Sequence, residues 1–422
     1  MNDSEKLSTE PYKGTRDFYP ADWAKLQAMF DRIRQTLASW GYEEYNASPL
    51  ERAELYESKT SEEIVNEQTY TFTDRGDRRV TLRPEMTPTL ARMVAAKRRE
   101  LPFPVRWFSI GNRFRYERPQ RGRLREFYQT DVDLLGAAGP EADIEIITLV
   151  ATILSAFDAK ESDFTIRVNS RTLLNAACAA AGLSGEQVRA YTHLLDRKAK
   201  MPAEEFAAAV REITERDPLA LIEQGGDPGV EHEKRALFDT IEALNTRGVT
   251  NARFDPTITR GFDYYTGIVF EVYDTNPANT RALFGGGRYD QLVALFGGDP
   301  IPAVGFGMGD VTLADFLETH QLTLPTNTKP QLYIGTPAAS DIPGAQAFAQ
   351  WLRAQGARVF VNLTEKSLGD QVKDAVRRGI PLFIAYGQNE VRQDLVRLKV
   401  LATGEEIGMA ASDVPPYIRA ER

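Results

Sequence analysis

The sequence predicts an α+β protein, in which an antiparallel sheet flanked by helices carries a helical insertion and is followed by a C-terminal α/β domain. Three observations lead to this prediction. Up to about residue 142, strand and helix patterns follow one another without a regular βαβ alternation, which favours an antiparallel sheet. Residues 143–247 are mainly helical and rich in alanine, and strand patterns return after them. Beyond residue 330, strands alternate with helices, which is typical of a small parallel α/β domain.

The first elements are predicted from apolar spacing and turn residues. Residues 22–40 place apolar side chains three and four positions apart, which predicts an amphipathic helix that Gly41 ends. Two strands are expected on either side of a turn at Gly76. A helix over residues 87–98 should begin with Thr87 as its N-cap and Pro88 at its first position.

A long antiparallel hairpin is predicted next, from residues 107–118 and 124–136 around the turn PQRGR. Strand patterns then return after the helical stretch, in NARFDPTIT, GIVFEVYD and LFGGGRYD. In the last domain, a helix over residues 367–378 should end at Gly379.

These patterns divide the chain into five parts. One sheet domain is expected in two pieces, residues 1–168 and 251–322, because the helical insertion at 169–250 interrupts it. Residues 323–330 are polar, contain two prolines and are interpreted as a linker. The C-terminal α/β domain is expected over 331–422.

Composition excludes several classes of protein. The net charge of −9 and the pI near 5.2 exclude indiscriminate binding to polyanions, so a nucleic-acid partner needs a local basic patch. Three His and one Cys without clustered spacing predict no metal site, and Cys178 is expected to be a buried small apolar residue. No apolar run reaches the ~18 residues of a membrane span, and the N-terminus lacks an apolar signal, so we expect a cytoplasmic protein without membrane contact.

A basic patch is found in the predicted hairpin. Residues 113–125 contain six arginines and one glutamate, a local charge of +5. On paired strands, Arg113, Arg115 and Glu117 should face one side together, and guanidinium groups bind phosphate in a bidentate manner. The alternative is a solvated surface, but such a dense cluster of one sign repels itself unless an anionic partner is present.

Three further segments are candidates for a binding site. Arg260 lies at the entrance to a strand, and the next tyrosines, Tyr264 and Tyr265, are expected to face opposite sides, with one hydroxyl free for a ligand. Two core tyrosines with satisfied hydroxyls are the alternative. Three glycines in FGGGRYD allow close approach of the backbone, but their spacing fits neither a phosphate loop nor a dinucleotide site. Glycines 305, 307 and 309 line one side of an extended chain, and face either a planar ligand or tightly packed structure.

Together these segments resemble a known family. KGTRDFYP, LRPEMT, FRYERPQRGRLREFYQTDVD, TRGFDYYTG, GGGRYD and the last α/β domain closely resemble histidyl-tRNA synthetases, which are class II aminoacyl-tRNA synthetases. The resemblance covers nearly the full length. It implies a homodimeric ligase with a class II catalytic sheet and a C-terminal anticodon-binding domain. The implied partners are L-histidine, ATP with Mg²⁺, and tRNA(His).

The resemblance also implies roles for the nucleotide-binding residues. Arg115 and Arg260 are the implied catalytic residues, which hold the α-phosphate from two sides. Arg123 reaches toward the terminal phosphates. Glu117 receives the adenine amino group, and Phe127 stacks on the adenine ring.

The implied histidine-binding residues share polar side chains. They are Glu85, Thr87, Arg115, Gln129, Asp133, Arg260, Tyr264 and Tyr265. In the family pattern Glu85, Thr87 and Gln129 meet the α-amino group, whereas Asp133 and Tyr265 bind the two imidazole nitrogens. A site that binds both nitrogens rejects analogues lacking them by roughly 10⁴, so no editing domain is expected.

The hairpin tip is the implied reader of the tRNA acceptor end, through Arg118, Gln120 and Arg121. One position departs from the family pattern, because Thr312 stands where the third class II motif usually has an arginine. Arg123, Arg121 or Mg²⁺ are possible substitutes. Two alternative functions follow, a non-catalytic synthetase-like regulatory protein that senses histidine or tRNA, and a class II synthetase for another amino acid.

Overall fold

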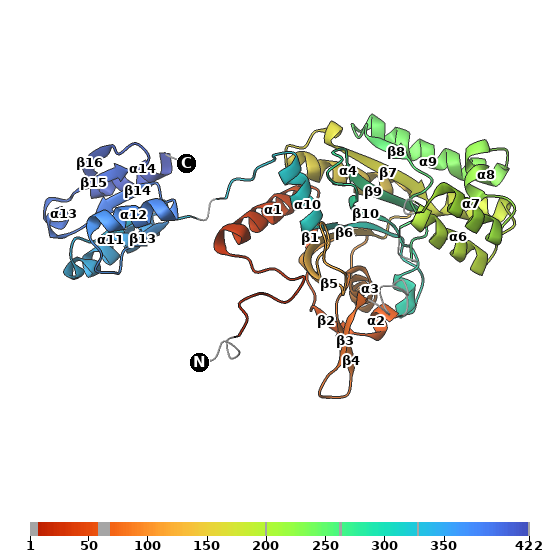
Figure 1. The fold of residues 1–422 in the computed structure, drawn as a ribbon, viewed down its shortest axis with the longest axis horizontal. Helices are drawn as coiled ribbons and strands as arrows, with labels where there is room; N and C mark the ends of the chain where they lie inside the picture. The colour runs from red at the N-terminus through yellow and green to blue at the C-terminus, as the bar shows by residue number, and fades with distance from the viewer. Residues whose placement is uncertain (1–6, 58–67, 199–200, 261–263, 327–328, 421–422) are drawn as a thin grey trace. The chain divides into compact units, whose positions relative to one another are not determined.

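The computed structural model describes residues 7–57, 68–198, 201–260, 264–326 and 329–420. The chain divides into two compact units, Met1–Leu324 and Pro325–Arg422 (Figure 1). The hydrophobic clusters of the first unit share no residue with those of the second. Each unit therefore has its own core, as expected of separate domains.

An eight-stranded sheet forms the centre of the first unit. In the order of the sheet its strands are β1 (Glu43–Glu44), β5 (Val105–Phe114), β6 (Glu126–Leu135), β11 (Ala303–Gly309), β10 (Ala282–Arg288), β9 (Ile268–Asp274), β7 (Phe164–Ser170) and β8 (Ala252–Phe254). Only the outermost pairs, β1 with β5 and β7 with β8, are parallel. The predicted antiparallel α+β sheet is confirmed.

The hairpin of β5 and β6 supplies the longest ladder of this sheet. Arg113 pairs with Phe127 near the turn, and Val105 pairs with Leu135 at the other end. Along β6, Val132 joins the main hydrophobic core, whereas the neighbouring Asp133 points to the opposite face. This alternation follows from the two-residue period of a strand and leaves one face of the sheet polar at its centre.

Ten helices are described in the first unit. They are α1 (Pro20–Ser39), α2 (Glu54–Glu57), α3 (Thr87–Lys97), α4 (Pro140–Ala156), α5 (Arg171–Ala180), α6 (Glu186–Arg197), α7 (Ala203–Ile213), α8 (Pro218–Gln224), α9 (Pro228–Thr246) and α10 (Asp310–Thr319). The helix predicted over 22–40 is α1, and its apolar stripe is buried. Helices α5 to α9 form the predicted helical stretch, and Cys178 is buried within it, as expected.

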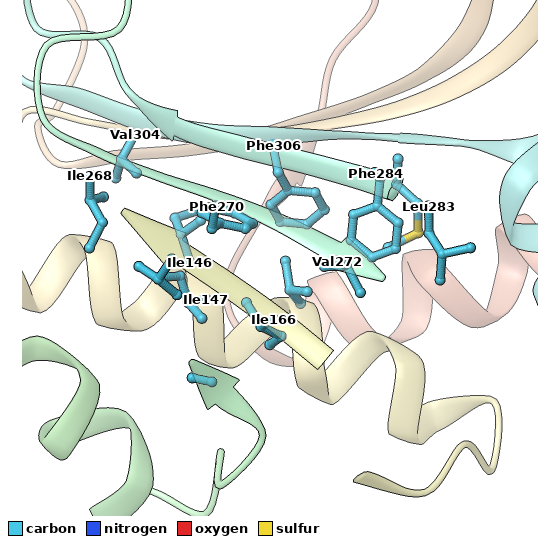
Figure 2. Packing of buried hydrophobic residues seen from close by; sticks show 14 of the residues in the cluster. Ile146, Ile147, Ile166, Ile268, Phe270, Val272, Leu283, Phe284, Val304 and Phe306 are labelled. Carbon is cyan, nitrogen blue, oxygen red and sulfur yellow. The ribbon is translucent and has the colours of Figure 1, made fainter. Parts of the chain in front are cut away.

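The main core lies between one face of the sheet and α4. Figure 2 shows Phe270, Phe284 and Phe306 from three neighbouring strands, close to Ile146 and Ile147 of α4. Burying an aromatic or branched aliphatic side chain of this size contributes about 1.5–3 kcal/mol. This packing fixes the positions of β9, β10 and β11, whose other face is then available for a binding site.

Helix α3 begins differently from the prediction. Thr87 is its first helical residue rather than its N-cap, and the N-cap Met86 makes no side-chain hydrogen bond to the helix. Pro88 lies in the first turn, where its missing N–H costs nothing. The Thr87 side chain lines the pocket described below, so it does not cap the helix.

A small three-stranded sheet covers the region before α3. Its strands are β2 (Leu50–Arg52), β4 (Arg79–Leu82) and β3 (Tyr70–Thr73), in that order. The turn between β3 and β4 is stabilised by Asp74, whose Oδ1 accepts the N–H groups of Gly76 and Arg78. The two predicted strands around Gly76 are confirmed.

The second unit contains a five-stranded sheet in the order β13 (Val359–Val361), β12 (Leu332–Gly335), β14 (Leu382–Ala385), β15 (Leu395–Val400) and β16 (Glu406–Ala410). Its helices are α11 (Ile342–Ala354), α12 (Leu368–Arg378), α13 (Gln388–Gln393) and α14 (Val414–Ala420). Gly379 ends α12 in the left-handed conformation, as predicted, whereas Ser367, which was expected to be the first helical residue, is the N-cap. The expectation of a parallel sheet is only half right, because β15 and β16 add an antiparallel hairpin.

Candidate active site

A pocket opens on the face of the large sheet that α4 does not cover. It is bordered by β6, β10, β11, the start of α3 and the segment before β9. The structure brings together in it all the residues that the sequence assigned to the amino acid and the nucleotide: Glu85, Thr87, Arg115, Glu117, Arg123, Phe127, Gln129, Asp133, Arg260, Tyr264 and Tyr265.

Glycines form the floor of this pocket. A Cβ atom on Gly305 would overlap Asp133 Oδ1 and lie 2.5 Å from the carbonyl oxygen of Val132. A Cβ atom on Gly307 would lie 2.6 Å from Gln129 Nε2, and one on Gly287 would lie 2.8 Å from the ring of Tyr265. The stripe expected along β11 therefore faces the pocket, and the absence of side chains there makes room for polar groups from neighbouring segments.

The pocket has two ends of different character. The buried end is formed by Glu85, Asp133, Arg260, Tyr264 and Tyr265. Glu85, Asp133 and Tyr264 are almost fully buried there. The open end is formed by Arg115, Glu117, Arg123 and Phe127, and half of the Arg123 side chain is exposed to solvent.

At the buried end, both tyrosines face the same side. Tyr264 donates its hydroxyl hydrogen to Glu85 Oε2 at 2.9 Å, and the ring centres of Tyr264 and Tyr265 lie 5.0 Å apart. The expectation that they face opposite sides is wrong, because strand β9 begins only at Ile268 and the two tyrosines precede it. Burial and the negative charge of Glu85 raise the pKa of Tyr264 well above its ordinary value, so the hydroxyl stays protonated.

Asp133 is the carboxylate at the centre of the buried end. Its Oδ1 accepts a hydrogen bond from the hydroxyl of Tyr289, whereas its Oδ2 is buried and has no hydrogen-bond partner among the described residues. Burial raises the pKa of Asp133 to about 8, with the nearby negative charge of Asp131 contributing. A buried oxygen without a partner costs free energy, and a ligand N–H placed there would recover it.

Asp131 lines the pocket beside Gln129 and Asp133. It accepts hydrogen bonds from Gln129 Nε2 at 2.6 Å and from Arg113 Nη2 at 2.5 Å. The Arg113 side chain is fully buried and forms an ion pair with Asp131. The expectation that Arg113 points into the site beside Arg115 and Glu117 is therefore wrong, because Arg113 holds Asp131 and, through it, Gln129.

Arg260 enters the buried end from an unusual backbone conformation, with φ at 61°. Its Nη1 donates to Glu271 Oε1 at 2.8 Å, and its Nε is buried without a hydrogen-bond partner among the described residues. Burial alone would lower the pKa of Arg260, but the charge of Glu271 outweighs burial and raises it overall. Arg260 is therefore a permanent cation with an unused donor.

At the open end, the contacts between side chains mainly involve arginines. Arg115 donates from Nε to the carbonyl oxygen of Pro84 at 3.0 Å, and its Cζ lies 5.4 Å from the ring centre of Phe127. Arg123 Nη1 lies 3.2 Å from Glu117 Oε2. A planar group can stack on Phe127, and an anion can bind Arg115.

The tip of the hairpin lies beyond the open end. Gln120 and Arg123 exchange two backbone hydrogen bonds across the turn, which keeps the tip compact. The side chains of Arg118, Gln120 and Arg121 are exposed, and none of the three lines the main pocket. Among the tip residues, Arg121 lines a smaller neighbouring cavity.

Thr312, the position that departs from the family pattern, lies in the first turn of α10 and lines the pocket. Its hydroxyl donates to the carbonyl oxygen of Leu283 at 2.5 Å. This hydrogen bond joins α10 to the start of β10.

Three residues of the site carry no role in the sequence prediction. They are Asp131, Tyr289 and Glu271, which bind Gln129, Asp133 and Arg260 respectively. Strand alternation could have indicated Asp131, because it lies two positions before Asp133 on the same face. Nothing local in the sequence links Tyr289 with Asp133 or marks Glu271 as the partner of Arg260.

Within the described ranges, no group of three or more His, Cys, Asp or Glu side chains comes together as a metal site would require. None of the described helices combines the length and apolar composition needed to cross a membrane.

Comparisons with known proteins identify similar chains over the full length. A family model described as histidyl-tRNA synthetase matches residues 14–310, and one described as an anticodon binding domain matches residues 328–421. A histidine–tRNA ligase of Leptospira biflexa is 39% identical, with 99% of each chain covered. Those of Halobacterium salinarum and Thermococcus kodakarensis are 36% and 34% identical, each over 93% of this chain and 94% of the relative.

Solved structures show the same fold. The histidyl-tRNA synthetase from Nostoc sp. PCC 7120 superposes with a TM-score of 0.81 at 23% identity, over 99% of this chain and all of that one. The apo enzyme from S. aureus superposes with a TM-score of 0.75 at 24% identity, over 98% and 100%.

Proposed function

The chain belongs to the histidyl-tRNA synthetase family and is a class II histidine–tRNA ligase, and we propose that the pocket described above is where L-histidine and ATP react. In the first step a carboxylate oxygen of histidine attacks the α-phosphorus of ATP. The new oxygen–phosphorus bond gives histidyl-adenylate, and pyrophosphate leaves with the electrons of the broken bond. In the second step a hydroxyl of the terminal ribose of tRNA(His) takes the histidyl group and AMP leaves.

The observation that carries the assignment of the amino-acid end is the buried Oδ2 of Asp133. It lacks a hydrogen-bond partner among the described residues, while Tyr289 occupies the other oxygen of the same carboxylate. An imidazole N–H fits this need, and Tyr265 is the proposed partner of the second ring nitrogen. A site that binds both nitrogens discriminates by roughly 10⁴ against analogues that cannot bind in this way.

The α-amino group of histidine is proposed to meet Glu85, Thr87 and Gln129. Two of these side chains are already held, because Tyr264 binds Glu85 and Asp131 binds Gln129. An ammonium group placed among fixed acceptors costs little reorganisation, which favours a defined position for the reacting carboxylate.

The α-phosphate is proposed to lie between Arg115 and Arg260. Arg260 has a buried, unused Nε, and both side chains line the pocket. Negative charge builds on the phosphate oxygens as the nucleophile attacks, and fixed cations that are already desolvated stabilise such charge. These two arginines are therefore the proposed catalytic residues.

The adenine is proposed to stack on Phe127 with its amino group toward Glu117, and Arg123 is proposed to reach the terminal phosphates. Mg²⁺ is expected to accompany ATP. It typically binds to substrate phosphates with one or two carboxylates. When bound, Mg²⁺ would neutralise charge on the phosphate oxygens.

The tRNA is proposed to bind both units. The exposed donors Arg118, Gln120 and Arg121 suit the acceptor end, and the C-terminal unit suits the anticodon because it matches an anticodon-binding domain. We further propose a homodimer that works in the cytoplasm, as the resemblance implies.

The test of the assignment is histidine-dependent exchange of labelled pyrophosphate into ATP, measured without tRNA. We expect exchange with L-histidine, and strong rejection of analogues methylated on either ring nitrogen. Absence of exchange would contradict the catalytic assignment and favour a regulatory relative. Exchange driven by a different amino acid would contradict the specificity.

A further inference from the structure

We propose that Arg281, together with Arg121, binds the terminal phosphates of ATP from a side cavity next to Thr312. This inference rests on the proposed function, since it assigns further residues to the same nucleotide. Two arginines beside Thr312 would then take the place of the single arginine that the family pattern has at this position.

The side cavity adjoins the main pocket. It is lined by Arg121, Arg281 and Asp315, and it shares Gly122, Leu283 and Thr312 with the lining of the main pocket. The shared residues form a common wall, so a ligand that extends past Thr312 reaches both arginines.

Charge favours an anion in the side cavity. The ionisable residues that line the main pocket comprise three arginines and four carboxylates, Glu85, Glu117, Asp131 and Asp133. Two of those arginines are already in ion pairs, Arg123 with Glu117 and Arg260 with Glu271. The main pocket therefore lacks the surplus of cations that a triphosphate requires, whereas the side cavity has two arginines and one carboxylate.

The two arginines of the side cavity are not committed elsewhere. Among the described residues, neither Arg121 nor Arg281 forms a salt bridge or a side-chain hydrogen bond, and both side chains are exposed. Burial raises the pKa of Asp315, and the positive charge of Arg121 opposes this rise, so the two side chains are close enough to interact. Guanidinium groups in this situation are available for bidentate binding of phosphate.

Thr312 contacts the segments that carry both arginines. Its hydroxyl binds the carbonyl oxygen of Leu283, two residues after Arg281, and so fixes the start of β10 against α10. On the other side, a Cβ atom on Gly122 would lie 3.5 Å from Thr312 Cγ2, so the hairpin tip with Arg121 lies directly over this position. A long side chain at 312 would compete with the tip for the same space, whereas threonine lets the tip approach.

The direct test compares the affinities of ATP and AMP by calorimetry in the wild type and in Arg281→Gln. Loss of a charge-assisted hydrogen bond to phosphate should weaken ATP binding about tenfold and leave AMP binding unchanged. In pyrophosphate exchange, KM for ATP should rise by a similar factor while KM for histidine stays constant. Arg121→Gln should act in the same direction, and Arg281→Lys should restore part of the affinity.

Arg235→Gln is the matched control, because it removes the same charge from an exposed site on α9 outside both cavities. It should change neither affinity. Unchanged ATP binding in the Arg281→Gln, Arg121→Gln double variant would overturn the inference, as would equal losses for ATP and AMP. Both outcomes leave histidine-dependent exchange intact in the wild type, whereas absence of that exchange would refute the proposed function itself.

Discussion

The two ends of the pocket are built in opposite ways. At the buried end, the Glu85 carboxylate, the Asp133 carboxylate and the Arg260 guanidinium each have a protein partner before any ligand arrives: Tyr264, Tyr289 and Glu271. At the open end, Arg123 is half exposed, and the side cavity beyond Thr312 holds two arginines with no salt bridge among the described residues.

This difference corresponds to what each end is proposed to recognise. A small amino acid offers few atoms, so discrimination depends on polar groups that are buried, fixed and incompletely satisfied, as Asp133 Oδ2 is. A nucleoside triphosphate carries several negative charges. Exposed cations can bind these charges without being held in exact positions. Substitutions at the buried end should therefore cost more than substitutions at the open end, and the predictions below test this ranking.

The largest effect is expected for Arg260→Ala. Removing a fixed, buried cation from the developing charge should lower the rate of pyrophosphate exchange about 10³-fold. Histidine binding, measured by calorimetry, should persist. Near-normal turnover would refute the role of Arg260, and Glu271→Gln is the control that separates loss of the cation from loss of its partner.

Asp133→Asn should weaken histidine binding about a hundredfold, since the buried carboxyl group proposed to bind the imidazole is lost. The same variant should be more stable than the wild type at high pH. In the folded protein Asp133 keeps its proton up to about pH 8, whereas an unfolded chain releases it near pH 3.9, so the wild type loses stability as pH rises between these values.

The measurement is the melting temperature of both proteins from pH 5 to pH 8.5, where the advantage of the variant should grow. Asp143→Asn is the contrasting control, because Asp143 is buried outside the pocket and paired with Arg288 at 3.0 Å. That variant should be destabilised and should bind histidine normally. An Asp133→Asn protein with an unchanged pH profile would contradict the buried carboxyl described here.

Gly305→Ala should reduce histidine affinity about tenfold or more, because the new methyl group overlaps Asp133 Oδ1 and lies 2.5 Å from a backbone oxygen. Gly309→Ala is a matched control on the same strand, since its Cβ atom would lie 3.6 Å from Thr312 Oγ1, an ordinary contact. Equal effects of the two substitutions would show that the floor of the pocket does not depend on close approach at Gly305.

At the open end, Phe127→Leu should raise KM for ATP about tenfold by removing an aromatic surface for stacking. KM for histidine should not change. Phe238→Leu, an exposed aromatic residue on α9, serves as the control. A rise in KM for histidine instead would place Phe127 at the wrong end of the pocket.

The smallest effect is expected for Arg118→Gln at the hairpin tip. Pyrophosphate exchange needs no tRNA and should be unaffected, whereas charging of tRNA(His) should fall a few-fold, with a weaker dependence on salt. Impaired exchange in this variant would mean that Arg118 serves the nucleotide rather than the tRNA.

Local patterns predicted the framework well. The spacing of apolar residues predicts α1, the alternation along β5 and β6 predicts their hairpin, and Gly379 predicts the end of α12. Each of these features is decided within a short stretch of chain. The composition of the site could also be predicted, because its arginines, tyrosines and glycines occur in dense runs.

Long-range pairing is what the sequence does not reveal. Tyr289 meets Asp133 across 156 positions, and Tyr264 meets Glu85 across 179, so no local pattern encodes either hydrogen bond. A second error came from the predicted start of a strand. Tyr264 and Tyr265 were expected within a strand and therefore on opposite faces, but β9 starts only at Ile268, after both residues. The β15–β16 hairpin was missed although its alternation is local, because the preceding strand–helix alternation favoured a parallel sheet.

The closely packed glycines of β10 and β11 limit which mutations the protein can tolerate. Every single-base change in a glycine codon that alters the amino acid adds a Cβ atom. At Gly285, Gly286, Gly305 and Gly307 that atom would lie 2.6 Å or less from a neighbouring atom, so no such substitution is conservative there. Variation in a population should therefore be purged at these positions while it accumulates at Gly139 or Gly408, where the backbone is not left-handed and a Cβ atom would meet nothing within 4 Å.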